Sequence, residues 1–274
     1  MRIDIFGTTH RGKVRAQNED QFFVASLSRT MQVQQTSLED LTVFRRLHDS
    51  SAYLLVVADG VGGAAGGRLA SGTAVEALAE HIGETVGCCY DFDVEREHEF
   101  LAELQAGVER AHQEVRRRHG SEGNHPATTL TTVVLRWPRA YVVHVGDSRA
   151  YYLRGGRLRQ LTRDQTAYDH LVDEGLIKED PPDQTGRRHM LRDVLTSAVG
   201  SEIEPTIGLI DLEPDDVLLL CTDGLTKHVP DSDITEILGA GASAETTCSR
   251  LLDLTLERGA RDNVTMVVGR FAAS

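Results

Sequence analysis

Acidic residues recur in this chain at the ends of short apolar runs. Three runs lead directly, or across one residue, into aspartates, which are Asp59, Asp147 and Asp223. Two further runs are preceded by acidic residues, which are Glu19, Asp20 and Asp262. Taken alone, an aspartate in such a place is most often a turn or cap residue. Five separate acidic groups in the same context are not five independent accidents, and they indicate a common site.

Carboxylates at the ends of buried strands are partly desolvated, and they repel one another unless they are protonated or neutralised by cations. Hard dications such as Mg²⁺ and Mn²⁺ prefer oxygen ligands, and no His or Cys motif in the sequence suits a softer metal. Asp59 and Asp223 are each followed by glycine, which lets the backbone carbonyl turn inward as a further ligand. The pattern therefore predicts an all-oxygen metal site.

Hydrophobic periodicity indicates the elements that must position these residues. Strands are expected where short runs rich in Val, Leu and Thr are bounded by Gly, Asp or Pro, at 21–25, 53–58, 130–135, 141–145, 217–221 and 264–268. Amphipathic helices are expected around 75–82, 101–115 and 248–255. The strands come in hairpin-joined groups and the helices in long blocks, which favours layered antiparallel sheet and helix over a doubly wound parallel sheet.

No internal repeat or low-complexity linker divides the sequence, so residues 1–274 are interpreted as a single domain. Two segments are expected to be peripheral. Residues 26–51 read as a polar insertion with a short helix at 38–47, and residues 162–195 are expected to protrude as a small flap.

The composition narrows the class of partner. Lys and Arg number 29 against 42 Asp and Glu, for a formal net charge of −13, which argues against nucleic acids and anionic membranes as partners. The N-terminus lacks the pattern of a signal peptide and no run is long enough to span a bilayer, so a cytoplasmic location is expected. The four cysteines lack metal-site spacing and are interpreted as reduced thiols.

Ordered motifs along the whole chain are similar to those of a known family. They are Arg15-Ala-Gln-Asn-Glu-Asp20, Asp59-Gly-Val-Gly-Gly63, Ala127-Thr-Thr129, Val145-Gly-Asp-Ser-Arg149, Leu161-Thr-Arg-Asp164, Val194-Leu-Thr196, Cys221-Thr-Asp-Gly-Leu225 and Arg261-Asp-Asn263. Each motif is weak alone, but their joint order and spacing are highly specific. On these residues the chain resembles the metal-dependent serine/threonine phosphatases of the protein phosphatase 2C (PPM) family, in their compact bacterial form.

The resemblance implies an α+β fold, a four-layer α-β-β-α sandwich of two mostly antiparallel sheets flanked by helices. A binuclear metal centre with Mn²⁺ or Mg²⁺ would lie at one end, with a small flap beside it. By motif match, Asp59 would bridge the two ions and Gly60 would contribute its carbonyl. The other implied ligands are Asp223 and Asp262 on one ion, Glu19 on the other through water, and Asp147 with Asp223 on a third ion common in bacterial relatives.

The remaining implied roles belong to residues around these ligands. Arg15 would clamp the substrate phosphate, and it would act with Asp59 in catalysis. Asp20 and Asn263 would support the ligands without touching metal. The five metal carboxylates carry −5, so two dications would bring the site to −1 and a third to +1, which converts a repulsive pocket into a phosphate receptor.

The implied activity is hydrolysis of phosphoserine and phosphothreonine in proteins by a metal-activated water, in opposition to a Ser/Thr protein kinase. Phosphorylated proteins and a cognate kinase are the expected partners, and the chain is expected to be a monomer. Three positions depart from the bacterial pattern: Ala64 replaces the usual His, Gly67-Arg68 replaces Gly-Glu, and Gln165 replaces the flap His. The metal ligands stay intact, and a metal-bound water is then the preferred acid for the leaving alkoxide.

Three alternatives stay open at this level. The stretch Gly60-Val-Gly-Gly-Ala-Ala65 resembles a weak dinucleotide-binding fingerprint, although the second strand that such a site needs is helical in pattern. A regulatory module that keeps the phosphatase fold without turnover is the other rival function. His144, beside the acidic strand end, is either a proton relay or, as the favoured interpretation, a core histidine with its hydrogen bonds satisfied.

Overall fold

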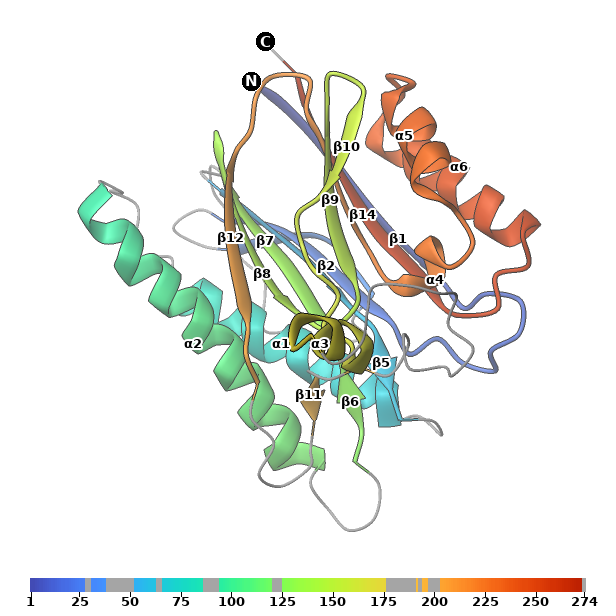
Figure 1. Cartoon of the computed structure of the whole chain (residues 1–274). Helices are drawn as coiled ribbons and strands as arrows, with labels where there is room; N and C mark the ends of the chain where they lie inside the picture. The colour runs from blue at the N-terminus through green and yellow to red at the C-terminus, as the bar shows by residue number, and fades with distance from the viewer. Residues whose placement is uncertain are drawn as a thin grey trace.

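The structure is a computed structural model that describes residues 1–27, 31–37, 52–62, 66–85, 94–119, 125–175, 191, 194–196 and 203–272. Within these residues the strands form two large sheets and one small sheet, and every strand pair is antiparallel. Helices cover the outer face of each large sheet (Figure 1). The predicted α+β sandwich of two flanked antiparallel sheets is therefore confirmed.

The larger sheet has six strands in the order β12-β8-β7-β4-β2-β3. Their bounds are β2 Gln21–Leu27, β3 Met31–Thr36, β4 Ala52–Ala58, β7 Leu130–Arg136, β8 Arg139–Val145 and β12 Thr206–Asp211. The central strands are almost wholly buried because the sheet is covered on both faces, which explains their continuous apolar sequences.

The second large sheet has five strands in the order β1-β14-β13-β9-β10. Their bounds are β1 Arg2–His10, β9 Arg149–Arg154, β10 Arg157–Gln160, β13 Val217–Cys221 and β14 Val264–Ala272. A short third sheet, β11-β6-β5, extends one end of the sandwich. Its strands are β5 Gly60–Val61, β6 Ala127–Thr128 and β11 Leu195–Thr196.

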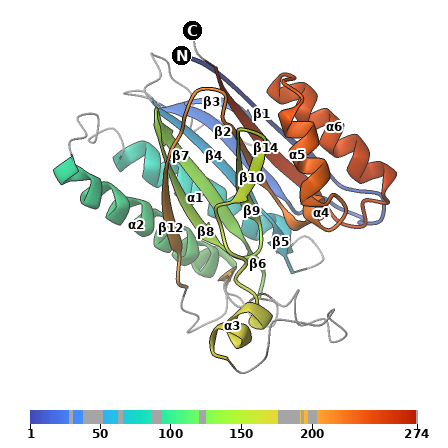
Figure 2. The same ribbon diagram turned by 45° about the horizontal axis from the view of Figure 1, so that its top comes forward.

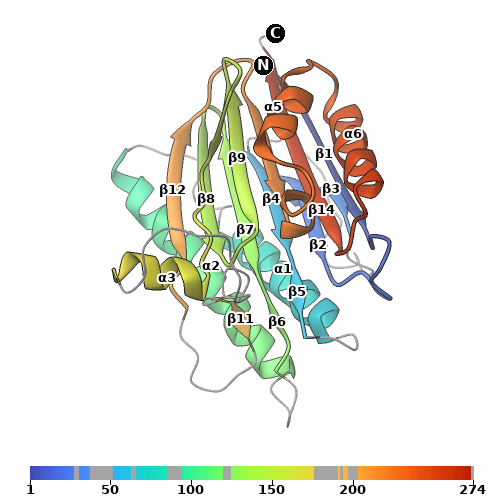
Figure 3. The same ribbon diagram turned by 45° about the vertical axis from the view of Figure 1, so that its right-hand side comes forward.

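The helices divide between the two outer faces. Helices α1, Gly66–Thr85, and α2, Val94–His119, lie on the six-stranded sheet. Helices α4, α5 and α6 lie on the five-stranded sheet, with bounds Asp223–Thr226, Asp231–Gly239 and Ala244–Glu257. Figures 1 and 3 show the two helical layers on opposite sides of the sheets. Among the described residues, no helix is both long enough and apolar enough to cross a membrane.

Alternation along the strands builds three separate cores. In β4, Leu54 and Val56 face α1 and α2, whereas Leu55 and Val57 face the other sheet. In β13, Leu219 faces α5 and α6 while its neighbours face the inner core between the sheets. One apolar layer between the sheets and one under each helical layer thus fix both sheets in a four-layer stack.

Every strand predicted from the sequence, and the helices predicted at 75–82, 101–115 and 248–255, lie inside observed elements of the same type. The segment expected as a peripheral insertion, 26–51, contributes the edge strand β3, and its predicted helix at 38–47 lies outside the described residues. The segment expected as a flap contains α3, Ala167–Asp173, which stands out at one end of the sandwich (Figure 2). Residues 176–190 of that segment lie outside the described residues, so the flap stays a prediction.

Candidate active site

Antiparallel pairing brings the acidic strand ends to a single edge of each sheet. The first residue of β2, Gln21, pairs with the last residue of β4, Ala58, so Asp20 and Asp59 lie beside each other. In the other sheet the end of β13 pairs with the beginning of β14, which places Asp223 near Asp262. The pairing register therefore brings together residues that lie about 40 positions apart in the sequence, which sequence spacing alone could not show.

One cavity of about 630 Å³ collects the predicted site residues from both sheets. Those that line it are Arg15, Glu19, Asp59, Gly60, Asp147, Asp223, Asp262 and Asn263. Every predicted metal ligand is in this set, together with the predicted phosphate-binding arginine. Asp20, predicted to lie behind the ligands, does not line the cavity and is 2% exposed. We refer to this cavity as the acidic pocket.

The loop that carries Glu19 is pinned to the other sheet by Asn263. The Asn263 side-chain amide donates to the backbone oxygens of Arg11 and Gln17, both at 2.9 Å, and its Oδ1 accepts from the Glu19 N–H at 2.8 Å. The Thr222 hydroxyl donates to Asp20 Oδ2 at 2.9 Å, which is a second link between the sheets. Both supporting residues predicted from the sequence thus join the two sheets at the pocket.

Backbone contacts hold Asp59 at the end of β4. Its N–H donates to Thr129 Oγ1 at 3.0 Å, and its carbonyl accepts from the Thr129 N–H at 2.9 Å. The next residue must be glycine, because a Cβ on Gly60 would overlap the backbone of Gly67 and would lie 2.5 Å from the Glu19 carbonyl oxygen. Helix α1 and the Glu19 loop can approach the Asp59 turn this closely only at a residue without a side chain.

Asp147 is fixed by the residues that begin the predicted flap. Gln165 and Gly146 exchange two hydrogen bonds, from Gln165 N–H to the Gly146 carbonyl at 2.7 Å and from Gly146 N–H to Gln165 Oε1 at 2.8 Å. Asp164 accepts a bidentate pair from Arg149 at 2.8 and 2.7 Å. The amide of Gln165, one of the departures from the family pattern, therefore anchors the turn that carries Asp147.

Burial and mutual repulsion raise the pKa of three carboxyl groups. Burial raises the pKa of Asp59 well above its ordinary value, and the charges of Asp20, Asp223 and Asp147 add to this effect. Burial, followed by the charges of neighbouring aspartates, also raises the pKa of Asp20 and the pKa of Asp147 to about 7. Such shifts are typical of carboxylates arranged for a function rather than for stability.

Two cations stand among these carboxylates. Arg15 makes a bidentate contact with Asp262, at 2.7 Å from Nε and 2.8 Å from one terminal nitrogen. Burial tends to raise the pKa of Asp262, but the Arg15 hydrogen bond and the Lys227 charge outweigh it and lower that pKa. Lys227 Nζ contacts Asp223 Oδ2 and lies 3.6 Å from Asp262 Oδ2. In the described part of the chain, no three His, Cys, Asp or Glu side chains converge in a ready-made metal cage.

The donor set fits hard dications. The lining carboxylates offer only oxygen, and Asp223 Oδ1 is buried without a hydrogen-bond partner among the described residues. A buried carboxylate oxygen without a partner is costly unless a cation completes it. The raised pKa values of the buried aspartates agree with this, because burial and mutual repulsion disfavour their charged forms when no cation is bound. Together these observations match the Mn²⁺ or Mg²⁺ that the sequence predicts.

Sequence reasoning missed Lys227 and Thr129. The signal for Lys227 was its spacing, because it follows Asp223 by four positions and so lies on the same face of a helical turn. Thr129 belongs to a quoted motif, yet its two bonds to Asp59 depend on the pairing of β4 with β7. Ala64 lies outside the described residues.

Known proteins share both the sequence pattern and the fold. Residues 29–257 match the family model of protein phosphatase 2C. The serine/threonine protein phosphatase PstP of Mycobacterium tuberculosis is 36% identical over 260 residues, which are 94% of this chain and 43% of that protein. The serine/threonine phosphatase stp of Listeria monocytogenes is 30% identical over 220 residues, 78% of this chain and 83% of that protein.

A solved structure extends the likeness to three dimensions. The catalytic domain of PstP in complex with two manganese ions is 32% identical and superposes with a TM-score of 0.71, covering 99% of each chain. The chain therefore belongs to the protein phosphatase 2C family. It spans 43% of the length of its mycobacterial relative, and most of the length of its Listeria relative.

Proposed function

We propose that this protein hydrolyses phosphoserine and phosphothreonine esters in proteins with the help of two divalent cations. The observation that carries the proposal is the acidic pocket, in which both sheets contribute carboxylates around one cavity with Arg15 at its rim. Membership of the protein phosphatase 2C family and the manganese-bound relative support the same chemistry. When bound, the ions would supply positive charge for the phosphate and would make a water molecule acidic enough to attack phosphorus.

The residues of the chain divide the work of holding the ions. Asp59, the carbonyl of Gly60 and Glu19 would hold one ion, and Asp223 and Asp262 would complete the other. Asp147 would serve a third ion together with Asp223. The pocket has an excess of negative charge, because five carboxylates line it and the basic side chains in its lining are those of Arg15 and Lys227. A phosphate dianion would be repelled from that pocket unless dications are bound.

Arg15 is suited to receive the phosphate. Its side chain is 54% exposed, so the guanidinium is held by Asp262 on one side and open to solvent on the other. A planar guanidinium donates two parallel hydrogen bonds to phosphate oxygens as readily as to a carboxylate. Transfer of Arg15 from Asp262 to the substrate would bind the phosphate and offset the charge that develops on its oxygens.

The rival functions differ in what they require. A dinucleotide site in the predicted place needs parallel strands on either side of the glycine-rich turn, and every strand pair in the described residues is antiparallel. A regulatory module without turnover would tolerate loss of the acidic residues, whereas this pocket keeps all five metal carboxylates. Neither rival has an observation in its favour.

The proposal extends to the setting of the enzyme. It acts as a monomer in the cytoplasm, on proteins phosphorylated by a Ser/Thr protein kinase. Cys221 and Cys248 are buried free thiols, which suits a reducing compartment.

The decisive experiment is phosphate release from a phosphothreonine peptide in Mn²⁺, compared with the same assay in chelator. We expect hydrolysis only with the metal, and a loss of about 100-fold or more in Asp223→Asn, because that variant weakens ion binding. Asp253→Asn, which changes an exposed carboxylate on α6, serves as the matched control and should keep the wild-type rate. Equal rates in Asp223→Asn and the wild type would overturn the proposal.

A further inference from the structure

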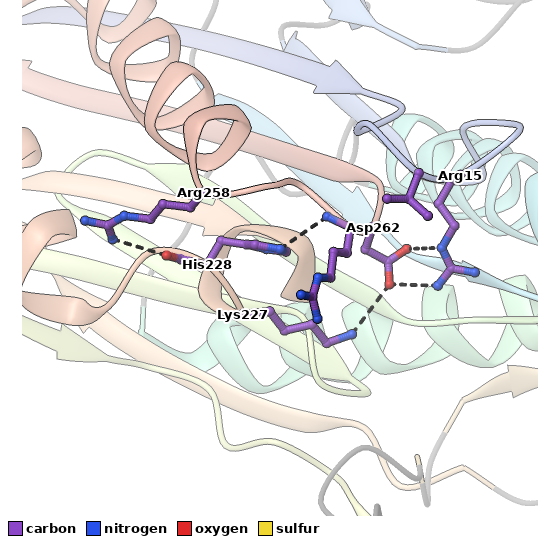
Figure 4. A pocket seen from close by; sticks show the side chains of 7 residues that line it. Arg15, Lys227, His228, Arg258 and Asp262 are labelled. Atoms are coloured by element: carbon purple, nitrogen blue, oxygen red, sulfur yellow. Dashed lines mark hydrogen bonds and ion pairs between the residues drawn. The ribbon is translucent and has the colours of Figure 1, made fainter.

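A second cavity, of about 700 Å³, adjoins the acidic pocket and is lined mainly by basic side chains. Figure 4 shows the residues that line it. Its lining residues are Val14, Arg15, Lys227, His228, Arg258, Arg261 and Asp262. We call it the basic pocket. Arg15, Lys227 and Asp262 line both cavities, so the two share a wall. No role assigned to the phosphatase reaction above uses Arg258 or Arg261.

The charge of the basic pocket runs against that of the whole chain. Four Arg and Lys side chains face one carboxylate, in a chain whose formal net charge is −13. Asp262 is already engaged by Arg15 and Lys227. A concave surface lined by one sign of charge focuses the field and concentrates ions of the other sign. Asp223 and Asp233 pair with Lys227 and Arg258 from outside the lining, so the excess positive charge of the basic pocket rests mainly on Arg261.

Hydrogen bonds fix the residues that form one wall of the basic pocket. His228 Nδ1 donates to the Gly224 carbonyl at 3.0 Å, which leaves Nε2 to accept from the backbone N–H of Arg261 at 3.2 Å. Arg258 donates to the His228 carbonyl at 3.1 Å and pairs with Asp233 at 2.5 Å. Figure 4 shows His228 between the Arg258 side and the Asp262 side of the cavity.

Arg261 differs from the other three cations. Its backbone is fixed by His228, but among the described residues its guanidinium forms no ion pair or hydrogen bond. Arg15, Lys227 and Arg258 each have a carboxylate partner. An exposed surface arginine is often solvated without further meaning. Here the unpaired guanidinium of Arg261 lies on a fixed turn, in a cavity next to the proposed phosphate site. Its donors are free to bind an anion, whereas those of the other three cations already contact carboxylates.

Because the two pockets share a wall, a peptide bound in the acidic pocket can also supply an anion to the basic pocket. In an extended peptide, side chains two residues apart point to the same side and lie about 7 Å from each other. A substrate whose phosphorylated residue enters the acidic pocket would therefore offer a residue two positions away to an adjoining cavity. Arginine forks suit carboxylate and phosphate oxygens equally.

We propose that the basic pocket is a substrate subsite that receives a second anionic side chain, lying close in sequence to the phosphorylated residue, with Arg261 as the residue that reads it. This inference rests on the proposed function and names its preferred substrate class: phosphoproteins with an acidic or second phosphorylated residue beside the target. The second anion contributes to binding, and its own bonds are not cleaved in the basic pocket.

The test compares phosphothreonine peptides that differ at the two positions two residues before and after the target. One peptide carries alanine there, one carries glutamate, and one carries a phosphonate analogue of phosphoserine that cannot be hydrolysed. We expect kcat/KM in Mn²⁺ to be about tenfold higher for at least one anionic peptide than for the alanine peptide, mainly through KM. That advantage should shrink as salt is raised, because the pocket is open to solvent.

The variant Arg261→Gln should lose most of that advantage, so that anionic and alanine peptides become similar substrates. The control is Arg250→Gln, an exposed arginine on α6 outside the basic pocket, which should keep the wild-type preference. A gain with glutamate assigns the pocket to carboxylates, and a gain with the phosphonate alone assigns it to phosphate.

Two results would overturn the subsite, and they differ from failure of the phosphatase proposal. The first is equal kcat/KM for all peptides in the wild type, and the second is an unchanged preference in Arg261→Gln. Either result leaves hydrolysis itself intact. Absence of hydrolysis of every peptide would instead overturn the proposed function, and the subsite with it.

Discussion

Lys227 shows how a single side chain can substitute for missing positive charge in a carboxylate cluster. It contacts Asp223 and approaches Asp262, two of the proposed metal ligands. Without dications, this lysine offsets part of the repulsion among the aspartates. A dication that binds Asp223 must compete with the same ammonium group. Lys227 should therefore stabilise the metal-free protein and weaken metal binding.

We predict that Lys227→Met lowers the melting temperature in chelator and enlarges the increase that Mn²⁺ produces. The loss in chelator should be about 1 kcal/mol, the size of a partly exposed ion pair. Thermal unfolding across a Mn²⁺ titration measures both effects. Lys13→Met, an exposed lysine on the neighbouring loop, is the matched control. A Mn²⁺ response no larger than that of the wild type would show that Lys227 does not compete with the metal.

His144 is a buried residue whose pKa predicts a pH dependence. Its Nε2 donates to the Arg163 carbonyl at 3.1 Å, so Nδ1 accepts from the Thr131 hydroxyl at 2.9 Å. Burial lowers the pKa of this imidazole to about 4. Both ring nitrogens are satisfied in the neutral form, which supports the interpretation of a core histidine over that of a proton relay.

Between pH 6.5 and about 4 the unfolded chain takes up a proton at His144 and the folded chain does not, so stability falls as pH falls. The full effect is about 3 kcal/mol, from a pKa difference of about 2.5. In His144→Gln this contribution is absent, so its stability deficit relative to the wild type should narrow from pH 7 to pH 4.5. Urea unfolding at the two pH values measures it. A constant deficit would contradict the prediction.

At the scale of elements, the strands with continuous apolar sequences could be predicted from the sequence, whereas the edge strands and the interior strand β9 could not. Strand β13 is fully buried and gives a continuous apolar run, which the sequence pattern locates at 217–221. Strands β1 and β12 lie at sheet edges and are mostly half-exposed or exposed, so their sequences show no such run. The strand ends with their aspartates follow from local pattern, but their meeting depends on pairing register, which pattern alone does not fix.

The basic pocket illustrates the same limit for charges. Arg258 and Arg261 look like solvated residues in the sequence, because nothing local relates them to Arg15 or Lys227. They meet only after β14 pairs with β1 and β13. The predicted site residues could be found because each belongs to a motif of a known family. Lys227 lies outside the quoted motifs, and Arg261 lies in the motif Arg261-Asp-Asn263 but was given no role there.

The turn from β13 into α4 provides a prediction about an element. A Cβ at Gly224 would overlap the carbonyl oxygen of Asn263, the residue that follows Asp262. Gly224→Ala should therefore destabilise the fold by about 1–3 kcal/mol and reduce the response to Mn²⁺, because it separates Asp223 from Asp262. Thermal unfolding with and without Mn²⁺ is the measurement.

Gly72→Ala in α1 is the matched control, since a Cβ there meets nothing within 4 Å. Alanine in a helix interior should raise stability by up to about 1 kcal/mol and leave the Mn²⁺ response unchanged. Similar behaviour of the two alanine variants would show that close approach at Gly224 does not position the site.

At the scale of the whole molecule, the acidic pocket opposes folding, and the rest of the fold offsets this. Three cores and a cross-sheet hydrogen-bond network hold carboxylates together that would separate in the unfolded chain. A ligand that binds only the folded state stabilises it by mass action. Dications should therefore raise the stability of the entire domain, because the two sheets must be assembled for the site to exist.

Protons and metal ions both relieve the repulsion within this cluster of carboxylates, which gives the stabilisation by metal a pH dependence. Burial raises the pKa of Asp20 and the pKa of Asp147 to about 7, above the ordinary value near 4. As pH rises from about 4 through 7, the unfolded chain loses these protons before the folded chain does, so the stability of the metal-free protein falls. The melting-temperature increase given by Mn²⁺ should therefore be larger at pH 7.5 than at pH 5.5. Calorimetry with Mn²⁺ and with chelator at both pH values measures the difference, and an equal or larger increase at pH 5.5 would mean that the ions do not bind where the carboxylates repel.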